Sequence, residues 1–323
     1  MNKKEIVFLD AFTNNPGDLS FESISLFGNL HVYDRTDSTD AVSIAERCEK
    51  AEIVIVNKFP VNELTLAYMP EVKYIVVAAT GYNNIDIEAV KGRNIQVSNV
   101  TGYSSESVTQ HIFASILTLL NKIEYYDHQV KNGRWSSCLD FCFYDHSILE
   151  LSGKTMGIFG YGNIGSRVGE VAHAFGMKII ATVNNRDRMK PDYVTFVDEE
   201  IIFQDSDILS LHCPLTEATS GIIKKSNLLK MKNSAILINT ARGKLIEERD
   251  LFYALDHGVI AGAILDVLTQ EPPSITNPLL NHSKCLISPH IAWAGQQSRT
   301  KLIDGIAKNI SAYCNNQWLN KIY

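Results

Sequence analysis

Short runs of apolar residues alternate with amphipathic stretches along almost the whole chain. The apolar runs are rich in Ile and Val, which is typical of strands buried on both faces of a sheet. Between the runs lie helical patterns, such as 40–50, where Asp40 is a candidate N-cap. This alternation predicts parallel sheets covered on both faces by helices. The predicted strands are 5–9, 31–33, 53–57, 74–78, 95–98, 155–159, 178–183, 208–212, 235–239, 263–267 and 285–288.

A long helical pattern separates the first five strands from the others. It begins near Ser104 and continues to about residue 131, with Gly133 as a stop signal, and predicts one long helix that links two domains. The segment 135–151 that follows is irregular and aromatic. If this segment were exposed, its apolar surface would promote association, so we expect it to pack on the neighbouring domain or to cover a partner subunit. A final helix is predicted over 297–313.

Length and composition narrow the class of protein without identifying it. At about 150 residues per domain, 323 residues predict two domains. Hydrophobic residues make up 45% of the chain and charged residues 20%, so long disordered stretches are not expected. A net charge of −6 without a basic block argues against nucleic-acid binding. No apolar run is long enough to span a membrane.

The six cysteines contain no CxxC pair. In a chain of this length, which enters a strand directly after Lys3 and Lys4 and therefore predicts no signal peptide, reduced thiols and a cytoplasmic location are expected. The only near-cluster of metal ligands is Cys138, Cys142 and His146, and we expect no metal site there.

A glycine-rich loop, Gly160-Tyr161-Gly162-Asn163-Ile164-Gly165, lies between a predicted strand and a helical pattern. In that setting GxGxxG predicts a dinucleotide site. Gly160 would permit the tight turn, Gly162 would let the backbone approach a pyrophosphate, and Gly165 would let helix and strand pack closely. The pyrophosphate would lie at the helix N-terminus. The alternative is a glycine-rich turn without a ligand.

The expected acidic ligand of the ribose is missing. A NAD site usually has Asp or Glu at the end of the next strand, but Val183 and Asn184 stand there, and Asp187 comes several residues later. Arg186 and Arg188 would either meet a 2′-phosphate or be ordinary solvated charges. We therefore predict that NADP(H) is at least tolerated beside NAD(H).

Three further polar segments follow predicted strands, where ligand crevices of doubly wound sheets occur. They are Asn239-Thr240-Ala241-Arg242-Gly243, Asp266-Val267 followed by Glu271-Pro272-Pro273, and Ser288-Pro289-His290-Ile291-Ala292-Trp293. Taken singly, Arg242, Glu271 and His290 could be a salt-bridge arginine, a loop acid and a structural histidine. Together, the three residues follow the glycine loop in this order along the chain, each after a predicted strand. That combination favours a catalytic group instead.

At these motifs the sequence closely resembles the D-isomer-specific 2-hydroxyacid dehydrogenases over essentially its whole length. Within that family it is most similar to the glycerate dehydrogenase (hydroxypyruvate reductase) branch. The residues that suggest this branch are Tyr33-Asp34-Arg35-Thr36, Ala78-Ala79-Thr80-Gly81-Tyr82-Asn83-Asn84, Asp140-Phe141-Cys142-Phe143 and His290-Ile291-Ala292-Trp293.

The resemblance implies a role for each motif. Arg242 would bind the substrate carboxylate and polarise the keto oxygen, and His290 would be the general acid. Glu271 would accept a hydrogen bond from the other imidazole nitrogen and favour the protonated ring. Asp266 would hold the nicotinamide carboxamide. Further substrate contacts would come from Ala79, Thr80, Gly81 and Trp293, and further cofactor contacts from Thr109, Gly160, Gly162, Asn163, Ile164, Gly165, Asn184, Arg186, Cys213, Pro214, Thr219, Thr240, Ala241 and His290.

The resemblance also implies the architecture: an α/β protein with two doubly wound domains, Rossmann-like and flavodoxin-like, and a cleft between them. The substrate domain would comprise residues 1–100 and 291–323, and the dinucleotide-binding domain residues 101–290. A homodimer is expected, with 135–144 as the candidate contact. The other histidines, including His111 and His173 on helical stretches, are interpreted as structural.

The expected activity is NAD(P)-dependent interconversion of a small 2-oxo acid and a D-2-hydroxy acid. Hydroxypyruvate with D-glycerate, or glyoxylate with glycolate, are the leading pairs. The alternatives are a D-2-hydroxyacid dehydrogenase of broader specificity and a dinucleotide-sensing binding protein, such as a corepressor, on the same scaffold.

Overall fold

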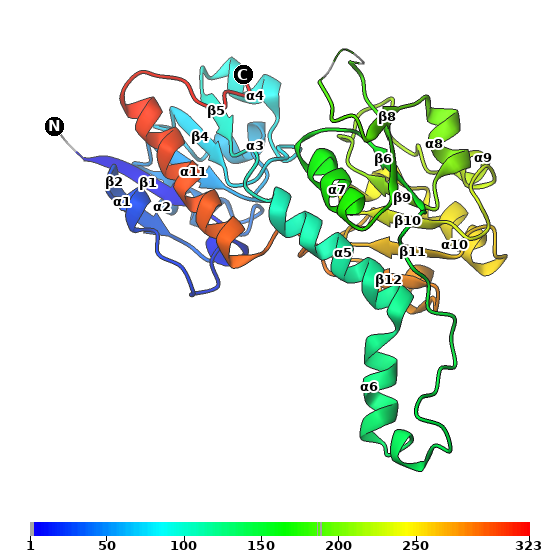
Figure 1. Cartoon of the computed structure of the whole chain (residues 1–323). Helices are drawn as coiled ribbons and strands as arrows, with labels where there is room; N and C mark the ends of the chain where they lie inside the picture. The colour runs from blue at the N-terminus through cyan, green and yellow to red at the C-terminus, as the bar shows by residue number, and fades with distance from the viewer. Residues whose placement is uncertain (1–2, 186, 188) are drawn as a thin grey trace. The chain divides into compact units, whose positions relative to one another are not determined.

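The computed structural model describes residues 3–185, 187 and 189–323. The chain forms two compact units (Figure 1). Unit 1 comprises Met1–Ser104 and Ala294–Tyr323, and unit 2 comprises Ser105–Trp293. The chain therefore begins in one unit, builds the other, and returns to the first.

Unit 1 contains a five-stranded parallel sheet in the order β2-β1-β3-β4-β5, the flavodoxin-like order. One face packs against α2, α3 and α4. The other face is covered by α1 and by α11 from the end of the chain. On that face Tyr74 stacks on Tyr313 with ring centroids 4.4 Å apart. The elements are β1 (Lys4–Phe8), α1 (Glu22–Ser25), β2 (Gly28–Val32), α2 (Ala41–Cys48), β3 (Ile53–Val56), α3 (Glu63–Leu66), β4 (Tyr74–Val77), α4 (Ile87–Gly92), β5 (Gln96–Asn99) and α11 (Gln296–Cys314).

The prediction that all strands of this series are buried is wrong for β2. This strand lies at the edge of the sheet and pairs only with β1 among the described strands. Only Gly28 of its five residues is buried, and His31 and Val32 are exposed. An edge strand has neighbours on one side only, so polar and partly exposed side chains are tolerated there.

Unit 2 contains a seven-stranded parallel sheet in the order β12-β11-β10-β9-β6-β7-β8. The order reverses between β6 and β9, as in dinucleotide-binding sheets. The fold class predicted from the sequence, two parallel-sheet α/β domains, is confirmed. The edge strand β8 was not predicted, because its three residues carry too short a pattern. The strands are β6 (Thr155–Phe159), β7 (Lys178–Thr182), β8 (Val194–Phe196), β9 (Ile208–Leu211), β10 (Ile236–Asn239), β11 (Gly262–Leu265) and β12 (Cys285–Ile287).

Successive strand residues of unit 2 pack against different helices, as a pleated sheet requires. Ile208 and Ile236 face α5 and α7, whereas Leu209 and Leu237 face α8, α9 and α10. The helices are α5 (Ser105–Asn121), α6 (Ile123–Lys131), α7 (Asn163–Ala174), α8 (Glu199–Asp205), α9 (Lys225–Leu228) and α10 (Glu248–Asp256). The described residues also form the 3₁₀ segments η1 (Ala11–Thr13), η2 (Trp135–Ser137), η3 (Gly243–Leu245) and η4 (Pro278–Asn281).

The prediction of one long helix over 104–131 is wrong. Lys122 adopts a left-handed conformation, with φ 52°, which ends α5 and starts α6 in a new direction. The apolar periodicity conceals this break because it continues across Lys122. Only α5 buries its apolar stripe, and α6 has no buried residue. Gly133, the predicted stop, follows α6 with φ 80°.

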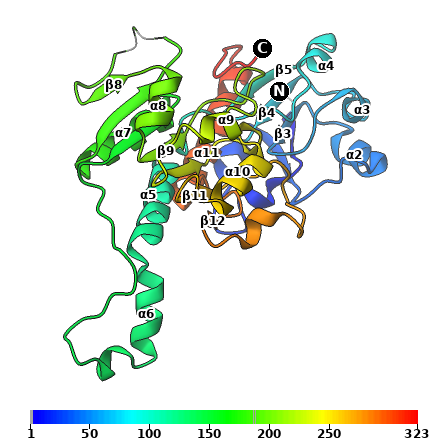
Figure 2. The same cartoon turned by 90° about the vertical axis from the view of Figure 1, so that its right-hand side faces the viewer.

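We call residues 123–150, which comprise α6 and the segment after it, the arm. It extends away from the seven-stranded sheet in two perpendicular views (Figures 1 and 2). The arm holds itself together: Arg134 pairs with Asp145, Tyr125 donates to Asp145 at 2.7 Å, and Trp135 donates to the carbonyl of Phe141 at 2.9 Å. Among the described residues, no helix has the length and hydrophobicity that crossing a bilayer requires.

Candidate active site

The glycine loop connects β6 to α7 at the point where the strand order reverses. Gly160 has φ +102°, and a Cβ there would lie 2.7 Å from the backbone nitrogen of Cys213. A Cβ at Gly165 would lie 2.4 Å from the carbonyl oxygen of Gly160. A Cβ at Gly162 would meet no described atom within 4 Å. Two glycines therefore permit the turn and the helix–strand contact, and the third leaves the outer side of the loop open to a pyrophosphate.

Two threonines predicted to line the cofactor site support this assignment. The Oγ1 atoms of Thr109 and Thr240 are buried and have no hydrogen-bond partner within the described part of the chain. Buried hydroxyl groups are nearly always hydrogen-bonded, so such a pair fits a ligand that carries polar groups. A dinucleotide, with its amide, hydroxyl and phosphate groups, fits both the threonines and the glycine loop.

The chain after β7, where a ribose ligand is expected, contains no acidic side chain at its first positions. Asn184 and Asn185 are exposed, and the Asn185 side chain accepts a hydrogen bond from the Asp187 backbone nitrogen at 3.0 Å. Asp187 therefore lies in a local turn. Arg186 and Arg188, the predicted alternatives for a 2′-phosphate, lie outside the described residues.

The segment after β9 is organised by its own hydrogen bonds. Thr219 donates to the carbonyl of Pro214 at 2.7 Å, which closes the 214–219 turn. Burial raises the pKa of the Cys213 thiol to about 11. Burial lowers the pKa of His212 to about 4, and its Nε2 lies 2.8 Å from the Ser210 hydroxyl. At neutral pH both side chains at the end of this strand are therefore uncharged.

The predicted pair of Glu271 and His290 is in direct contact. His290 Nδ1 lies 2.6 Å from Glu271 Oε2, and Glu271 Oε1 accepts from the backbone nitrogen of Leu268 at 3.1 Å. Because an ionised carboxylate only accepts, Nδ1 carries the proton of this bond and Nε2 is the nitrogen left for chemistry. About a quarter of the His290 side chain is exposed, at 27%. The Trp293 indole donates to the His290 carbonyl at 2.9 Å.

His290 adopts a left-handed backbone conformation, with φ 55°, which is unfavourable for a residue with a Cβ. Asp266, only 2% exposed, stabilises this conformation through hydrogen bonds to the neighbouring backbone. Its carboxylate accepts from the backbone nitrogens of Ile291 and Ala292, both at 2.9 Å, and from the Ser288 hydroxyl at 2.5 Å. The backbone nitrogen of His290 also donates to the Asp266 carbonyl at 2.8 Å. With three donors, the buried carboxylate is occupied in holding the loop 288–293.

Two residues of α5 that the sequence did not indicate also bind the loop 288–293. His111 Nε2 lies 2.9 Å from the Ser288 hydroxyl, and Ser107 donates to the Ala292 carbonyl at 2.6 Å. From the sequence alone, His111 is interpreted as a structural residue. Ser107 and His111 stand at positions i and i+4, which places both on one face of α5, but several other residues of this helix are also polar, so the spacing alone does not single them out.

Arg242 follows β10, which lies beside β11 in the sheet, and β11 in turn lies beside β12. Arg242, Glu271 and His290 thus follow three adjacent parallel strands and belong to one edge of the sheet. The Arg242 guanidinium donates to the Ala241 carbonyl at 2.7 Å. A Cβ at Gly243 would lie 2.0 Å from the backbone of Leu268, so this glycine lets the Arg242 loop lie against the segment that carries Glu271.

The predicted substrate loop, Ala79, Thr80 and Gly81, lies in unit 1 after β4. The Thr80 hydroxyl donates to the Val100 carbonyl at 3.1 Å, and the Asn99 side chain donates to the Thr80 carbonyl at 2.6 Å. These bonds hold the loop at the carboxyl edge of the five-stranded sheet.

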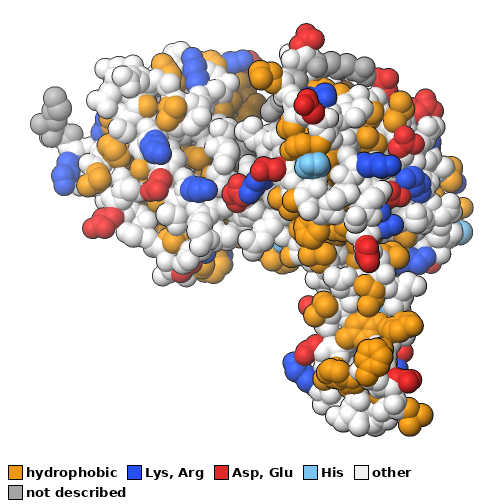
Figure 3. Space-filling model, viewed as in Figure 1, with side chains coloured by type: hydrophobic (Ala, Val, Ile, Leu, Met, Phe, Trp, Pro, Cys, Tyr) orange, Lys and Arg blue, Asp and Glu red, His pale blue; other side chains and the backbone are white. Residues whose placement is uncertain are grey.

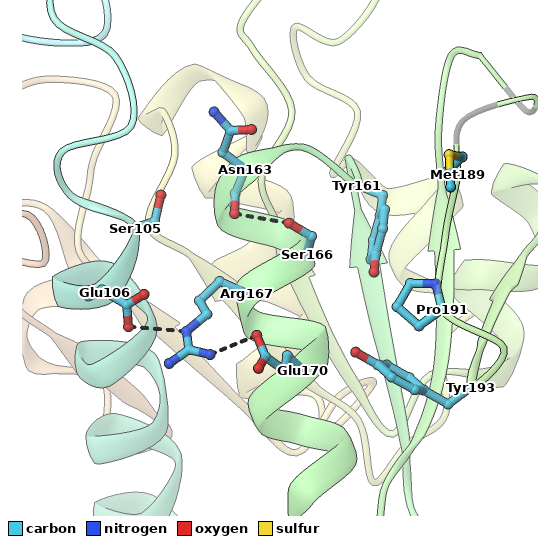
Figure 4. Close-up of a pocket in the computed structure, with 10 residues that line it drawn as sticks. All are labelled: Ser105, Glu106, Tyr161, Asn163, Ser166, Arg167, Glu170, Met189, Pro191 and Tyr193. Carbon is cyan, nitrogen blue, oxygen red and sulfur yellow. Dashed lines mark hydrogen bonds and ion pairs between the residues drawn. The ribbon is translucent and has the colours of Figure 1, made fainter.

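A pocket of about 460 Å³ lies on the outer side of the glycine loop, between α5, α7 and residues 189–193 (Figure 4). Arg167 lies in it and is bonded to Glu106 at 3.1 Å and to Glu170 at 2.7 Å. Arg242, Glu271 and His290 do not line this pocket. Because the predicted catalytic groups lie at the strand ends, we do not assign the chemistry to it.

All six cysteines are free thiols. Within residues 3–185, 187 and 189–323, no group of three or more His, Cys, Asp or Glu side chains is placed to hold a metal ion.

A doubly wound sheet with a glycine loop after β6 and, at the same edge after β12, a histidine bound to a carboxylate fits a nicotinamide-dependent oxidoreductase. Comparison with known proteins agrees. Residues 113–292 match the family model of the D-isomer specific 2-hydroxyacid dehydrogenase NAD binding domain. The chain belongs to the family of D-isomer-specific 2-hydroxyacid dehydrogenases.

Relatives match over almost the full length. A hydroxypyruvate reductase of Blautia hydrogenotrophica is 38% identical over 98% of this chain and 99% of its own. A glycerate dehydrogenase of Methylorubrum extorquens is 37% identical, covering 96% of each chain. Among solved structures, an acyclic imino acid reductase in complex with NADPH and D-Arg has a TM-score of 0.85 at 30% identity, over 99% of this chain and 100% of that chain.

Proposed function

We propose that the protein reduces hydroxypyruvate to D-glycerate, or glyoxylate to glycolate, with NAD(P)H. The observation that carries this proposal is the 2.6 Å contact of His290 with Glu271 in the unit that holds the glycine loop. The names of relatives support it, since they include a hydroxypyruvate reductase, a glycerate dehydrogenase and several glyoxylate reductases.

Each residue of the site has a distinct role in the proposed reaction. A reduced nicotinamide, when bound, would supply the hydride for the carbonyl carbon. Arg242 binds the carboxylate of the 2-oxo acid and polarises its keto oxygen, because a guanidinium matches a planar carboxylate. His290 delivers the proton from Nε2 to that oxygen, while Glu271 fixes the ring and stabilises its protonated form. The organic product is D-glycerate from hydroxypyruvate, or the achiral glycolate from glyoxylate.

The remaining site assignments form part of the same proposal. Ala79, Thr80, Gly81 and Trp293 contact the substrate, and the backbone nitrogens of the 79–81 loop bind its carboxylate. Residues 1–100 and 291–323 form the substrate domain, and residues 101–290 form the cofactor domain. Asp266 contacts the nicotinamide carboxamide, as the resemblance to the family implies.

We expect NADPH to be used about as well as NADH, with kcat/KM values within about tenfold of each other, a difference of about 1.4 kcal/mol. The reason is the absence of an acidic side chain at Val183 and Asn184, where a carboxylate would repel a 2′-phosphate. The measurement is a panel of short 2-oxo acids assayed with both cofactors in parallel. A preference for NADH of more than a hundredfold would contradict the expectation.

The same panel separates the alternatives. High kcat/KM for many longer 2-oxo acids would indicate a dehydrogenase of broader specificity. Tight cofactor binding without turnover of any 2-oxo acid would indicate a dinucleotide sensor and would overturn the proposed function. The intact set of Arg242, Glu271 and His290 argues against a sensor, but sensors on this scaffold can keep these residues, so turnover decides.

We also propose a homodimer that pairs through the arm. Apolar side chains gather on the arm (Figure 3), and six of them are more than half exposed: Ile123, Trp135, Leu139, Phe141, Tyr144 and Ile148. Phe141 is 89% exposed although it lies in a segment fixed by hydrogen bonds, as expected of a surface that a second copy covers.

Replacing Leu139 and Phe141 together by Asp is therefore expected to convert the dimer to a monomer, measured by light scattering after size-exclusion chromatography. The matched control is Leu26→Asp, because Leu26 is 79% exposed but lies in unit 1. A wild-type monomer, or a dimer that survives both arm substitutions, would refute the assignment.

A cytoplasmic location completes the proposal. Free thiols at all six cysteines suit a reducing compartment. Fractionation of the producing cells tests it.

A further inference from the structure

We propose that His111 is a positioning residue for the loop 288–293: through Ser288 and Asp266 it fixes the backbone that presents His290. The inference rests on the proposed function, because it concerns the same site. It is carried by a continuous chain of contacts, from His111 Nε2 to the Ser288 hydroxyl at 2.9 Å and from that hydroxyl to Asp266 Oδ1 at 2.5 Å.

The donors of this chain have one consistent direction. The Ser288 hydroxyl has a single proton, and it donates to Asp266. In its contact with His111, the Ser288 oxygen must therefore be the acceptor. His111 Nε2 is then the donor and carries a proton. His111 Nε2 also lies 3.7 Å from Asp266 Oδ1, close enough for direct attraction when the ring is protonated.

Asp266 connects this chain to the backbone on the far side of His290. It is 2% exposed, and it accepts from the backbone nitrogens of Ile291 and Ala292 at 2.9 Å. The left-handed conformation of His290 persists only when its surroundings determine it. The position of the His290 ring therefore depends on the orientation of the buried Asp266 carboxylate.

The helix that carries His111 is a rigid support. Ile112 and Ile116 of α5 are fully buried against the sheet of unit 2. The same helix also holds the loop through Ser107, which donates to the Ala292 carbonyl at 2.6 Å. α5 thus contacts the loop on both sides of His290.

The His111 side chain is 20% exposed and is not part of the apolar core. Its removal leaves the packing of α5 intact and acts on a polar network. Losing the Nε2 donor frees the Ser288 hydroxyl to rotate, and with it the Asp266 carboxylate, because a partly satisfied network has several arrangements.

The test compares His111→Ala, His111→Gln and Gln110→Ala in the full chain with 2-oxo acid and NADH. We expect His111→Ala to lower kcat by about 10- to 100-fold, as loss of an orienting partner usually does, while KM and cofactor Kd stay within about twofold. Gln places an amide nitrogen near the position of Nε2, so His111→Gln should recover most of kcat. Gln110 lies beside His111 on α5 and is exposed, so its replacement should change nothing.

A second readout does not depend on activity. Amide hydrogen exchange at Ile291 and Ala292 should accelerate in His111→Ala and in Ser288→Ala, and return toward the wild-type rate in His111→Gln. Faster exchange in a protein without 2-oxo acid reductase activity would refute the proposed function and support the positioning role. Unchanged exchange, an unchanged kcat, or a uniform loss of activity without recovery by Gln would overturn the inference. Ser288→Ala keeps the test open if His111→Ala does not fold.

Discussion

Replacing His290 by Ala is expected to lower kcat by about 10²- to 10⁴-fold, the range that positioned general acids contribute. The Nε2 proton is the only one that the His290–Glu271 pair can deliver, because the Nδ1 proton lies in the 2.6 Å bond to the carboxylate. Cofactor affinity should be retained, since the glycine loop, Thr109 and Thr240 are unchanged. The measurements are steady-state reduction of hydroxypyruvate and fluorescence titration with NADH.

The control for this substitution is His257→Ala. His257 is also in unit 2 but is exposed after the end of α10, where it bonds to the Tyr253 carbonyl. It should leave kcat unchanged. A kcat of His290→Ala equal to that of the wild type would remove His290 from the proposed role, whereas a loss of cofactor binding would indicate a collapsed loop 288–293.

The sequence predicted most strands to within one or two residues, for an identifiable reason. Buried parallel strands such as β3 and β9 are short runs of Ile, Val and Leu that read differently from everything around them. Strands at sheet edges lack that contrast, and for that reason β8 was missed and β2 was misread as buried. The break at Lys122 was invisible because its cause is a backbone angle at a residue with no strong preference for it.

The site shows the same division between local and long-range information. The glycine loop, Arg242 and His290 could be predicted from the sequence because each belongs to a short motif that directly follows a strand. His111 supports His290 through a contact with Ser288, which lies 177 positions further along the chain, and the spacing of polar residues on α5 does not reveal so distant a partner. The resemblance supplied Glu271 as the partner of His290, and the structure places the two in contact.

Replacing Arg242 by Ala is expected to lower kcat/KM for the 2-oxo acid by about 10²- to 10⁴-fold, because it removes two charge-assisted bonds of about 1.5–3 kcal/mol each. KM should rise through the lost carboxylate contact, and kcat should fall through the lost polarisation of the keto oxygen. Cofactor Kd should stay the same. The measurement is a full set of steady-state rates at several concentrations of 2-oxo acid.

Arg242→Lys separates geometry from charge. A lysine keeps the positive charge but presents one ammonium group in place of a planar fork, so it should recover only a small part of kcat/KM. Arg249→Ala is the matched control, because Arg249 is an exposed arginine of α10 in the same unit. If Arg242→Lys restored wild-type rates, the site would need only a positive charge. If Arg242→Ala left kcat/KM intact, the carboxylate would have to be held elsewhere, and the 79–81 loop would become the first residues to replace.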